Sequence, residues 1–114
     1  MNPITYSINN TNILQFTEDL DAGSIAPVKE LFSDYAHSDR SVVIDLTDVH
    51  FIDSSGVGAI VFLYKRLLVK QLSVVVIGLH GQPEQLFEML QLNRSLECHT
   101  TMTDYLASVT PVVA

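Results

Sequence analysis

The chain is poor in cysteine and in basic residues, and each shortage argues against a kind of protein that it could be. A single cysteine, Cys98, cannot form an internal disulfide, which favours a reducing, cytoplasmic location. Six lysine or arginine residues stand against thirteen aspartate or glutamate residues, for a formal net charge of −7. This balance argues against direct nucleic-acid binding, because such proteins contact phosphates mainly through lysine and arginine.

The sequence also lacks a long apolar run and a recognisable secretory leader. No run approaches the roughly 18 residues expected of a membrane span, and the opening "MNPITYSINN" has neither the basic nor the apolar region of a signal peptide. Over its 114 residues, 47% are hydrophobic and 17% are charged, which is a globular composition. We therefore expect one domain covering residues 1–114, with no membrane span.

The acidic excess lies in the first half of the chain. Up to Val57, nine acidic residues face only Lys29 and Arg40, whereas from Gly58 onward four acidic residues balance four basic ones. This asymmetry is consistent with an acidic face formed by the first half.

Apolar periodicity in the first half predicts a hairpin followed by a helix. Ile4, Tyr6 and Ile8 alternate with polar residues, which predicts a half-buried strand. Turn-forming residues 9–12 connect it to a second strand at "ILQF". Helical spacing then predicts a helix from roughly Asp21 to Ala36.

The second half alternates buried strands with helices. The β-branched runs 42–46 and 73–79 predict inner strands covered on both faces. Between them, a helix is expected to bury the stripe Val57, Ile60, Val61, Tyr64 and Leu68. A helix in "PEQLFEMLQL", a short edge strand in "LECH" and a last helix ending at Val109 complete the chain. The predicted fold class is α/β, with the order β-β-α-β-α-β-α-β-α and a mixed, mostly parallel sheet.

Polar residues are concentrated where the first inner strand meets the following helix, at Asp53-Ser54-Ser55-Gly56. Either Asp53 or Ser54 can serve as the N-cap of that helix. A cap needs only one such side chain, and Gly56 and Gly58 weaken a helix start that should be strong. We therefore interpret these glycines as leaving the first turn open to another surface.

The residues of this junction do not match the motifs of several enzyme classes. Gly56 and Gly58 supply part of a dinucleotide-binding fingerprint, but Val61 stands where its third glycine should be. The sequence has no P-loop and no G-x-S-x-G elbow, and its four histidines are scattered. We therefore predict no catalytic residue, no metal site and no cofactor.

The topology predicts that this junction shares one edge of the sheet with other polar loops, since ligands and partners gather at the carboxyl ends of parallel strands. The residues expected at this edge are Glu18, Asp19, Asp21, Asp53, Ser54, His80, Gly81 and Gln82. A phosphate of about −1.5 to −2 charge on Ser54 would sharply change the field there. We expect free amides at the helix start to accommodate it.

The segment "VVIDLTDVHFIDSSGVGAI" resembles the central signature of the STAS domain, in particular that of bacterial anti-sigma factor antagonists. The resemblance implies a single STAS domain over nearly the whole chain. It implies that Ser54 is phosphorylated by a partner that is both anti-sigma factor and serine kinase, and that a phosphatase removes the phosphate. The unphosphorylated chain would bind that partner and release the sigma factor.

The implied partner-binding surface comprises Asp19, Asp21, Asp53, Ser54, Ser55 and Gly56. Leu20-Asp21 resembles the family's L-D pair, but Glu18 stands where the family usually has glycine in its "G-E-L-D" pattern. An alternative within the family is a constitutive adaptor subunit of a phospholipid-transport ABC complex, or a signalling scaffold. The sequence leaves the oligomeric state open.

Overall fold

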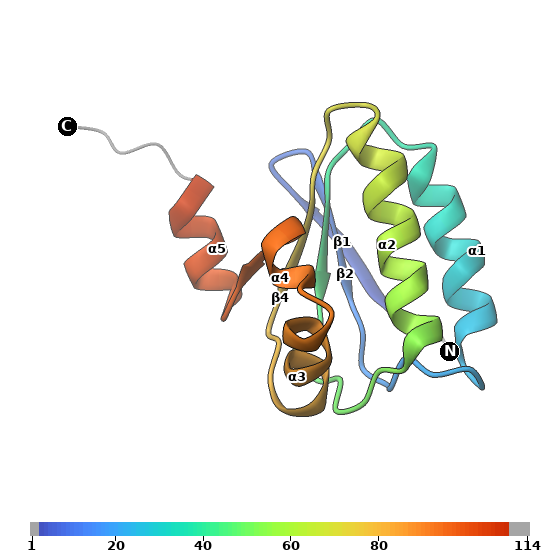
Figure 1. Cartoon of the computed structure of the whole chain (residues 1–114). Helices are drawn as coiled ribbons and strands as arrows, with labels where there is room; N and C mark the ends of the chain where they lie inside the picture. Colours follow the sequence, from blue (N-terminus) through green and yellow to red (C-terminus); the bar gives the residue numbers. More distant parts are fainter. Residues whose placement is uncertain (1–2, 110–114) are drawn as a thin grey trace.

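The computed structural model describes residues 3–109 as a five-stranded sheet with helices on both faces (Figure 1). The strands lie in chain order: β1 (Ile4–Ile8), β2 (Thr11–Gln15), β3 (Val42–Asp45), β4 (Val74–Ile77) and β5 (Glu97–His99). β1 pairs antiparallel with β2, and every later pairing is parallel. The predicted mixed, mostly parallel α/β sheet is confirmed.

The predicted hairpin is present, but its first strand is more exposed than expected. Asn9 and Asn10 form the connection with φ of 49° and 67°, a left-handed region that asparagine tolerates. The prediction that β1 is half-buried was wrong for Ile4 and Tyr6, which are 53% and 41% exposed. β1 is an edge strand, so its side chains have neighbours on one side only.

Four helices match the predicted ones: α1 (Ile25–Ala36), α2 (Ser54–Leu68), α3 (Gly81–Met89) and α5 (Met102–Val109). The short helix α4 (Leu92–Ser95) between α3 and β5 was not predicted. α1 and α2 lie side by side on one face of the sheet, and α5 lies on the other side of the molecule (Figure 1). No helix within residues 3–109 is long and apolar enough to cross a membrane.

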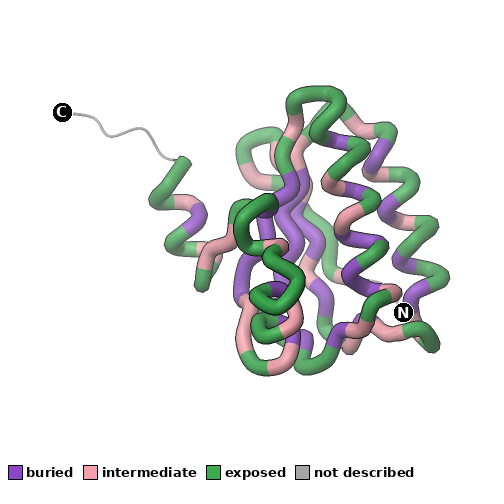
Figure 2. Tube along the Cα trace, in the orientation of Figure 1, coloured by how far each residue is buried: buried purple, intermediate pink, exposed green. Residues whose placement is uncertain are grey.

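The two faces of the sheet carry cores of different size. β3 and β4 are buried at every position, as their β-branched runs predicted. Alternate residues of β2, β3 and β4 pack under α1, α2 and α3 in the main core. Buried residues, purple in Figure 2, follow the inner strands and recur along α1 and α2. The opposite face holds a smaller cluster covered by α5, formed by Ile13, Val43, Val75, Ile77 and Tyr105.

The buried face of α2 differs from the predicted stripe. Val57 and Ile60 are buried as expected, but Leu68 is 52% exposed, and Val61 and Tyr64 are only partly buried. Leu63 and Leu67, which are both fully buried, take the expected place of Leu68 in the core. α2 is apolar around much of its circumference, so helical spacing alone could not select the side that faces the sheet.

This orientation of α2 predicts a clear difference between two leucines on the same helix. Leu63→Ala should lower the free energy of unfolding by about 2–5 kcal/mol, because it leaves a cavity in the main core. Leu68→Ala should change it by less than about 0.5 kcal/mol, because Leu68 lies at the surface. Urea denaturation of both variants measures the two values, and equal losses would contradict the orientation.

Candidate functional site

Asp53 is the N-cap of α2, and its carboxylate bridges two segments of the chain. Oδ1 accepts hydrogen bonds from the backbone N–H groups of Ser55 (2.9 Å) and Gly56 (3.2 Å). Oδ2 accepts a third bond from the N–H of Ala22 at 2.9 Å, in the loop that follows β2. The expectation that Asp53 or Ser54 caps this helix is therefore confirmed for Asp53.

These bonds also set the ionisation of Asp53. Partial desolvation raises its pKa, but the backbone bonds from Ala22, Gly56 and Ser55, with a further bond from the Ser55 side chain, outweigh it. The net pKa of Asp53 lies below its ordinary value. At neutral pH the carboxylate is ionised and carries a fixed negative charge directly beside Ser54.

A second set of bonds joins the loop after β2 to the segment before Asp53. Asp19 Oδ1 accepts from the N–H groups of His50 and Phe51, both at 3.1 Å. Leu20 N–H donates to the Phe51 carbonyl, and Asp53 N–H donates to the Leu20 carbonyl, both at 3.1 Å. The two segments are thus held side by side through backbone as well as side-chain bonds.

Asp21 completes this edge and also holds its own turn. Its Oδ1 accepts from the N–H groups of Gly23 (3.0 Å) and Ser24 (3.1 Å), just before α1. Asp19 and Asp21 therefore each organise a loop, and both remain partly exposed. Glu18, which replaces the glycine of the family pattern, is exposed and has no positive φ, so the backbone here does not require glycine.

The two serines of the junction differ in exposure. Ser54, the first residue of α2, is exposed, whereas Ser55 is partly buried and bonds to Asp53. The Ser54 hydroxyl is therefore more accessible than that of Ser55. Ser54 is the hydroxyl that an approaching protein would meet first.

The two glycines of the first turns have different roles. Gly56 is buried, and a Cβ added there would lie 2.7 Å from the Leu20 carbonyl oxygen and 2.6 Å from Ile52 Cγ1. The interpretation that Gly56 opens the helix to another surface was wrong, because Gly56 lets α2 approach the chain at Leu20. Gly58 is exposed, with nothing within 4 Å of an added Cβ, and for this glycine the interpretation stays a prediction.

The structure adds residues that sequence reasoning had not assigned to the site. A hollow of about 390 Å³ lies over the loops of this edge, lined by Thr17, Glu18, Asp19, Asp21, Ser24, Asp48 and His50. Asp48 and His50 had no role assigned from the sequence. The acidic excess of the first half, which the sequence did show, is the signal that could have indicated this hollow.

The start of α3 contributes to the same edge, as the topology predicted for residues 80–82. The Gln82 side chain bonds to the N–H and the carbonyl of Ile52, each at 2.9 Å. His80 Nε2 lies 2.8 Å from the Thr47 carbonyl oxygen, and the rings of His50 and His80 meet edge to face at 5.4 Å. These contacts fix the segment that leads into Asp53.

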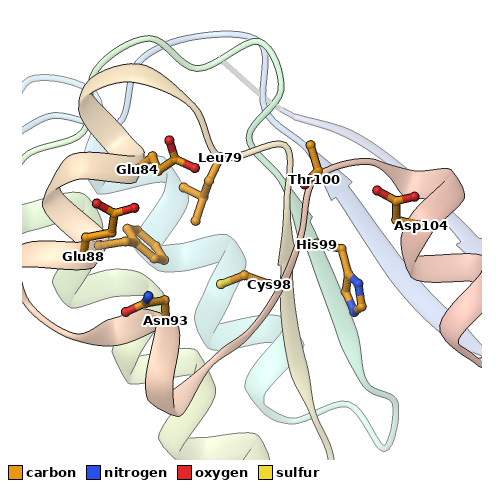
Figure 3. Close-up of a pocket in the computed structure, with 9 residues that line it drawn as sticks. Leu79, Glu84, Glu88, Asn93, Cys98, His99, Thr100 and Asp104 are labelled. Atoms are coloured by element: carbon orange, nitrogen blue, oxygen red, sulfur yellow. The ribbon is translucent and has the colours of Figure 1, made fainter.

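A separate cavity of about 340 Å³ lies between α3, β5 and α5 (Figure 3). Its lining includes Phe87 and Cys98, with Glu84, Glu88 and Asp104 around them, and it contains none of the residues of the Ser54 edge. Burial, with a smaller effect of Glu97, raises the pKa of the Cys98 thiol. A raised pKa disfavours the thiolate that a nucleophilic cysteine needs. Among residues 3–109, no three His, Cys, Asp or Glu side chains are placed to hold a metal ion.

The fold and this edge together define an α/β domain whose strand-end loops converge on one helix N-terminus. The chain belongs to the STAS domain family, whose model matches residues 2–105. An anti-sigma-B factor antagonist of Listeria monocytogenes serovar 1/2a is 35% identical over 80 residues, covering 69% of this chain and 70% of the relative.

Solved structures agree with this fold. A putative anti-sigma factor antagonist from Thermotoga maritima has a TM-score of 0.86 at 18% identity, covering 94% of this chain and 93% of that one. The Bacillus cell fate determinant SpoIIAA in its phosphorylated form has a TM-score of 0.74 at 14% identity, covering 95% and 99%.

The packing of Gly56 against Leu20 predicts opposite effects at the two glycines. Gly56→Ala should lower the free energy of unfolding by about 1–3 kcal/mol, because the new methyl group overpacks the contact. Gly58→Ala, the matched control, should raise it by about 0.5–1 kcal/mol, because it removes backbone freedom from the unfolded chain. Chemical denaturation distinguishes them, and a neutral Gly56→Ala would contradict the close packing.

The lowered pKa of Asp53 predicts a pH-dependent contribution to stability. The folded state holds the ionised carboxylate, so the contribution is fully present above the unfolded pKa of about 3.9 and is lost as pH falls through the lower folded pKa. Wild type should therefore be more stable than Asp53→Asn at pH 7, and the difference should shrink at about pH 3. Denaturation midpoints at the two pH values test this, and a difference that grew on acidification would contradict it.

Proposed function

We propose that this chain is an anti-sigma factor antagonist regulated by phosphorylation of Ser54. In this proposal the unphosphorylated chain binds an anti-sigma factor that is also a serine kinase. Phosphorylation of Ser54 by that kinase weakens the complex, and a phosphatase restores binding. The chain would act in the cytoplasm as a single domain, without catalysing a reaction and without contacting nucleic acid.

Two kinds of observation support this proposal. The Listeria relative, at 35% identity, is named an anti-sigma-B factor antagonist. The Bacillus protein, which shares the fold, has been solved in a phosphorylated form, although its 14% identity carries only the fold. Neither comparison identifies the modified residue here, so the choice of Ser54 depends on the geometry of this chain.

The exposure of Ser54 beside a fixed carboxylate is the observation that carries the proposal. Ser54 is exposed at the first position of α2, next to the ionised Asp53, and a kinase can reach its hydroxyl without unfolding the helix. Ser55 is partly buried and bonds to Asp53, so its modification would disturb the cap. These contacts favour Ser54 over Ser55 as the acceptor.

The mechanism of inhibition follows from the occupied cap. We had expected amides at the helix start to accommodate the phosphate, but Asp53 already accepts from Ser55 N–H and Gly56 N–H. A phosphate on Ser54 would therefore remain at the surface and add about −1.5 to −2 charge beside Asp53. A partner surface suited to a neutral hydroxyl would lose its contact there, and burying the larger, charged phosphate in that surface would cost desolvation.

The proposed partner face consists of Asp19, Asp21 and residues 53–56, with different contributions. Ser54 would contact the partner directly, and Asp19, Asp21 and Asp53 would present partly exposed charges. Gly56 is buried, so its contribution would be to place the helix start rather than to touch the partner. Acidic charge around one neutral hydroxyl favours a partner surface with basic residues at its rim.

Ser54→Ala should abolish labelling when the chain is incubated with ATP and an anti-sigma factor kinase from the same organism. Ser55→Ala is the matched control and should still be labelled. Ser54→Ala should keep its affinity for the kinase, while Ser54→Asp should bind at least about tenfold more weakly with an unchanged unfolding midpoint. Mass spectrometry locates the phosphate, and calorimetry measures the binding.

Two outcomes would overturn the proposal in different ways. Labelling that persists in Ser54→Ala and disappears in Ser55→Ala would show that the wrong serine was chosen. Absence of both labelling and binding with the anti-sigma factor kinases of the organism would instead favour the constitutive adaptor or scaffold alternative.

A further inference from the structure

The outer edge of β1 is an unpaired sheet edge in the part of the chain that the structure describes. β1 and β5 are the two ends of the sheet, and within residues 3–109 no segment pairs with the outer side of β1. A free edge presents a row of N–H and C=O groups to which another strand can add. Proteins that remain monomeric usually protect such edges.

The two edges of this sheet differ in that protection. β5 is three residues long and carries Glu97 and His99, whose Oε2 and Nε2 atoms lie 2.6 Å apart. β1 is five residues long, pairs in regular register with β2, and contains no charged residue, no proline and no bulge. β5 therefore follows the usual protective pattern, and β1 does not.

The hairpin turn determines which backbone groups of β1 face outward. In a hairpin with a two-residue connection, the flanking pair Ile8 and Thr11 exchanges hydrogen bonds, and such pairs recur at every second residue. Tyr6 and Ile4 are then bonded to β2. The N–H and C=O groups of Thr5 and Ser7 point to the free edge, where they can bond to a second strand.

The side chains of β1 present an apolar surface beside that edge. Tyr6 lies opposite Ile13, a member of the small core under α5, so Ile4, Tyr6 and Ile8 share the α5 face of the sheet. Ile4 is 53% exposed and Tyr6 is 41% exposed. A strand that added to β1 would cover both.

The distribution of charge favours a second copy of this chain as the partner that pairs with the free edge of β1. The net charge of −7 opposes association of two copies over most of the surface. All charged side chains lie between Glu18 and Asp104, so residues 1–17, which include the whole hairpin, carry none. β1 thus offers two copies an approach that brings no charged side chain of either hairpin into contact.

We propose that the chain forms a two-fold symmetric dimer by antiparallel pairing of β1 with β1 of a second copy. Thr5 exchanges hydrogen bonds with Ser7 of the second copy, and Ser7 does the same with its Thr5. Tyr6 lies on the two-fold axis opposite Tyr6 of the second copy, and Ile4 meets the other Ile8. The two sheets become one continuous sheet of ten strands, twice the five of one chain.

This dimer is independent of the proposed switch. α2 and Ser54 belong to the opposite face of the sheet from Tyr6, because α2 packs on the main core and Tyr6 lies on the α5 side. Each dimer would therefore carry two separate Ser54 edges. Loss of the dimer would leave Ser54 labelling unchanged, and loss of labelling would leave the dimer unchanged.

Thr5→Pro tests the edge with little effect on the monomer. The substitution removes an outward N–H that the β1–β2 ladder does not use, and it removes this donor from both copies. Sedimentation velocity over a range of concentrations should show wild type at twice the chain mass, and Thr5→Pro should raise the dimer Kd by about tenfold or more. Tyr6→Lys should also raise the dimer Kd, because it places two ammonium groups face to face. Val69→Lys is the control: Val69 is the C-cap residue of α2 and is 85% exposed, so this substitution should leave the Kd unchanged.

Cysteine cross-linking tests the register directly in a Cys98→Ser background. The proposed pairing brings the two Tyr6 Cα atoms to about 4.5 Å, within disulfide range, so Tyr6→Cys should give an intermolecular disulfide under mild oxidation. The two Ser7 Cα atoms would be more than about 8 Å apart, so Ser7→Cys should not cross-link. A wild-type chain that stays monomeric at all concentrations, or equal cross-linking of the two variants, would overturn the proposal.

Discussion

The carboxylate of Asp53 is the interaction on which the rest of this site depends. It accepts three backbone hydrogen bonds, two from the first turn of α2 and one from Ala22 in the loop after β2. These bonds begin the helix at Ser54 and fix the loop that carries Asp21. By fixing where α2 begins, this N-cap determines the position of Ser54 as well as stabilising the helix. Without it, Ser54 would have neither a defined place nor a defined charge beside it.

The same carboxylate explains how a single phosphate could act without unfolding the domain. Asp53 already accepts hydrogen bonds from the N–H groups of Ser55 and Gly56, so a phosphate on Ser54 would stay at the surface of the domain. It would join an edge that already holds Asp19, Asp21 and Asp48 around a hollow. The binding surface would change mainly in charge, and such a change can be reversed when a phosphatase removes the phosphate.

The sequence predicted those parts of the structure that are encoded locally. The continuous β-branched runs gave β3 and β4, turn residues gave the hairpin, and Asp53 was one of two predicted caps. The predictions failed where contacts between segments far apart in the sequence determine the burial or the bonding of a residue. The exposure of Leu68, the burial of Gly56 against Leu20 and the bonds that Asp19 accepts from the backbone N–H groups of residues 50 and 51 all depend on tertiary contacts that no local pattern contains.

The central claim is that modification of Ser54 changes the surface and leaves the Asp53 cap in place. Amide hydrogen exchange of the phosphorylated and unphosphorylated chain tests it residue by residue. The account predicts that the amides of Ser55, Gly56 and Ala22 stay equally protected in both forms, together with the rest of α2 and the inner strands. Loss of protection along α2 on phosphorylation would contradict the account, because inhibition would then arise from local unfolding and not from charge at the interface.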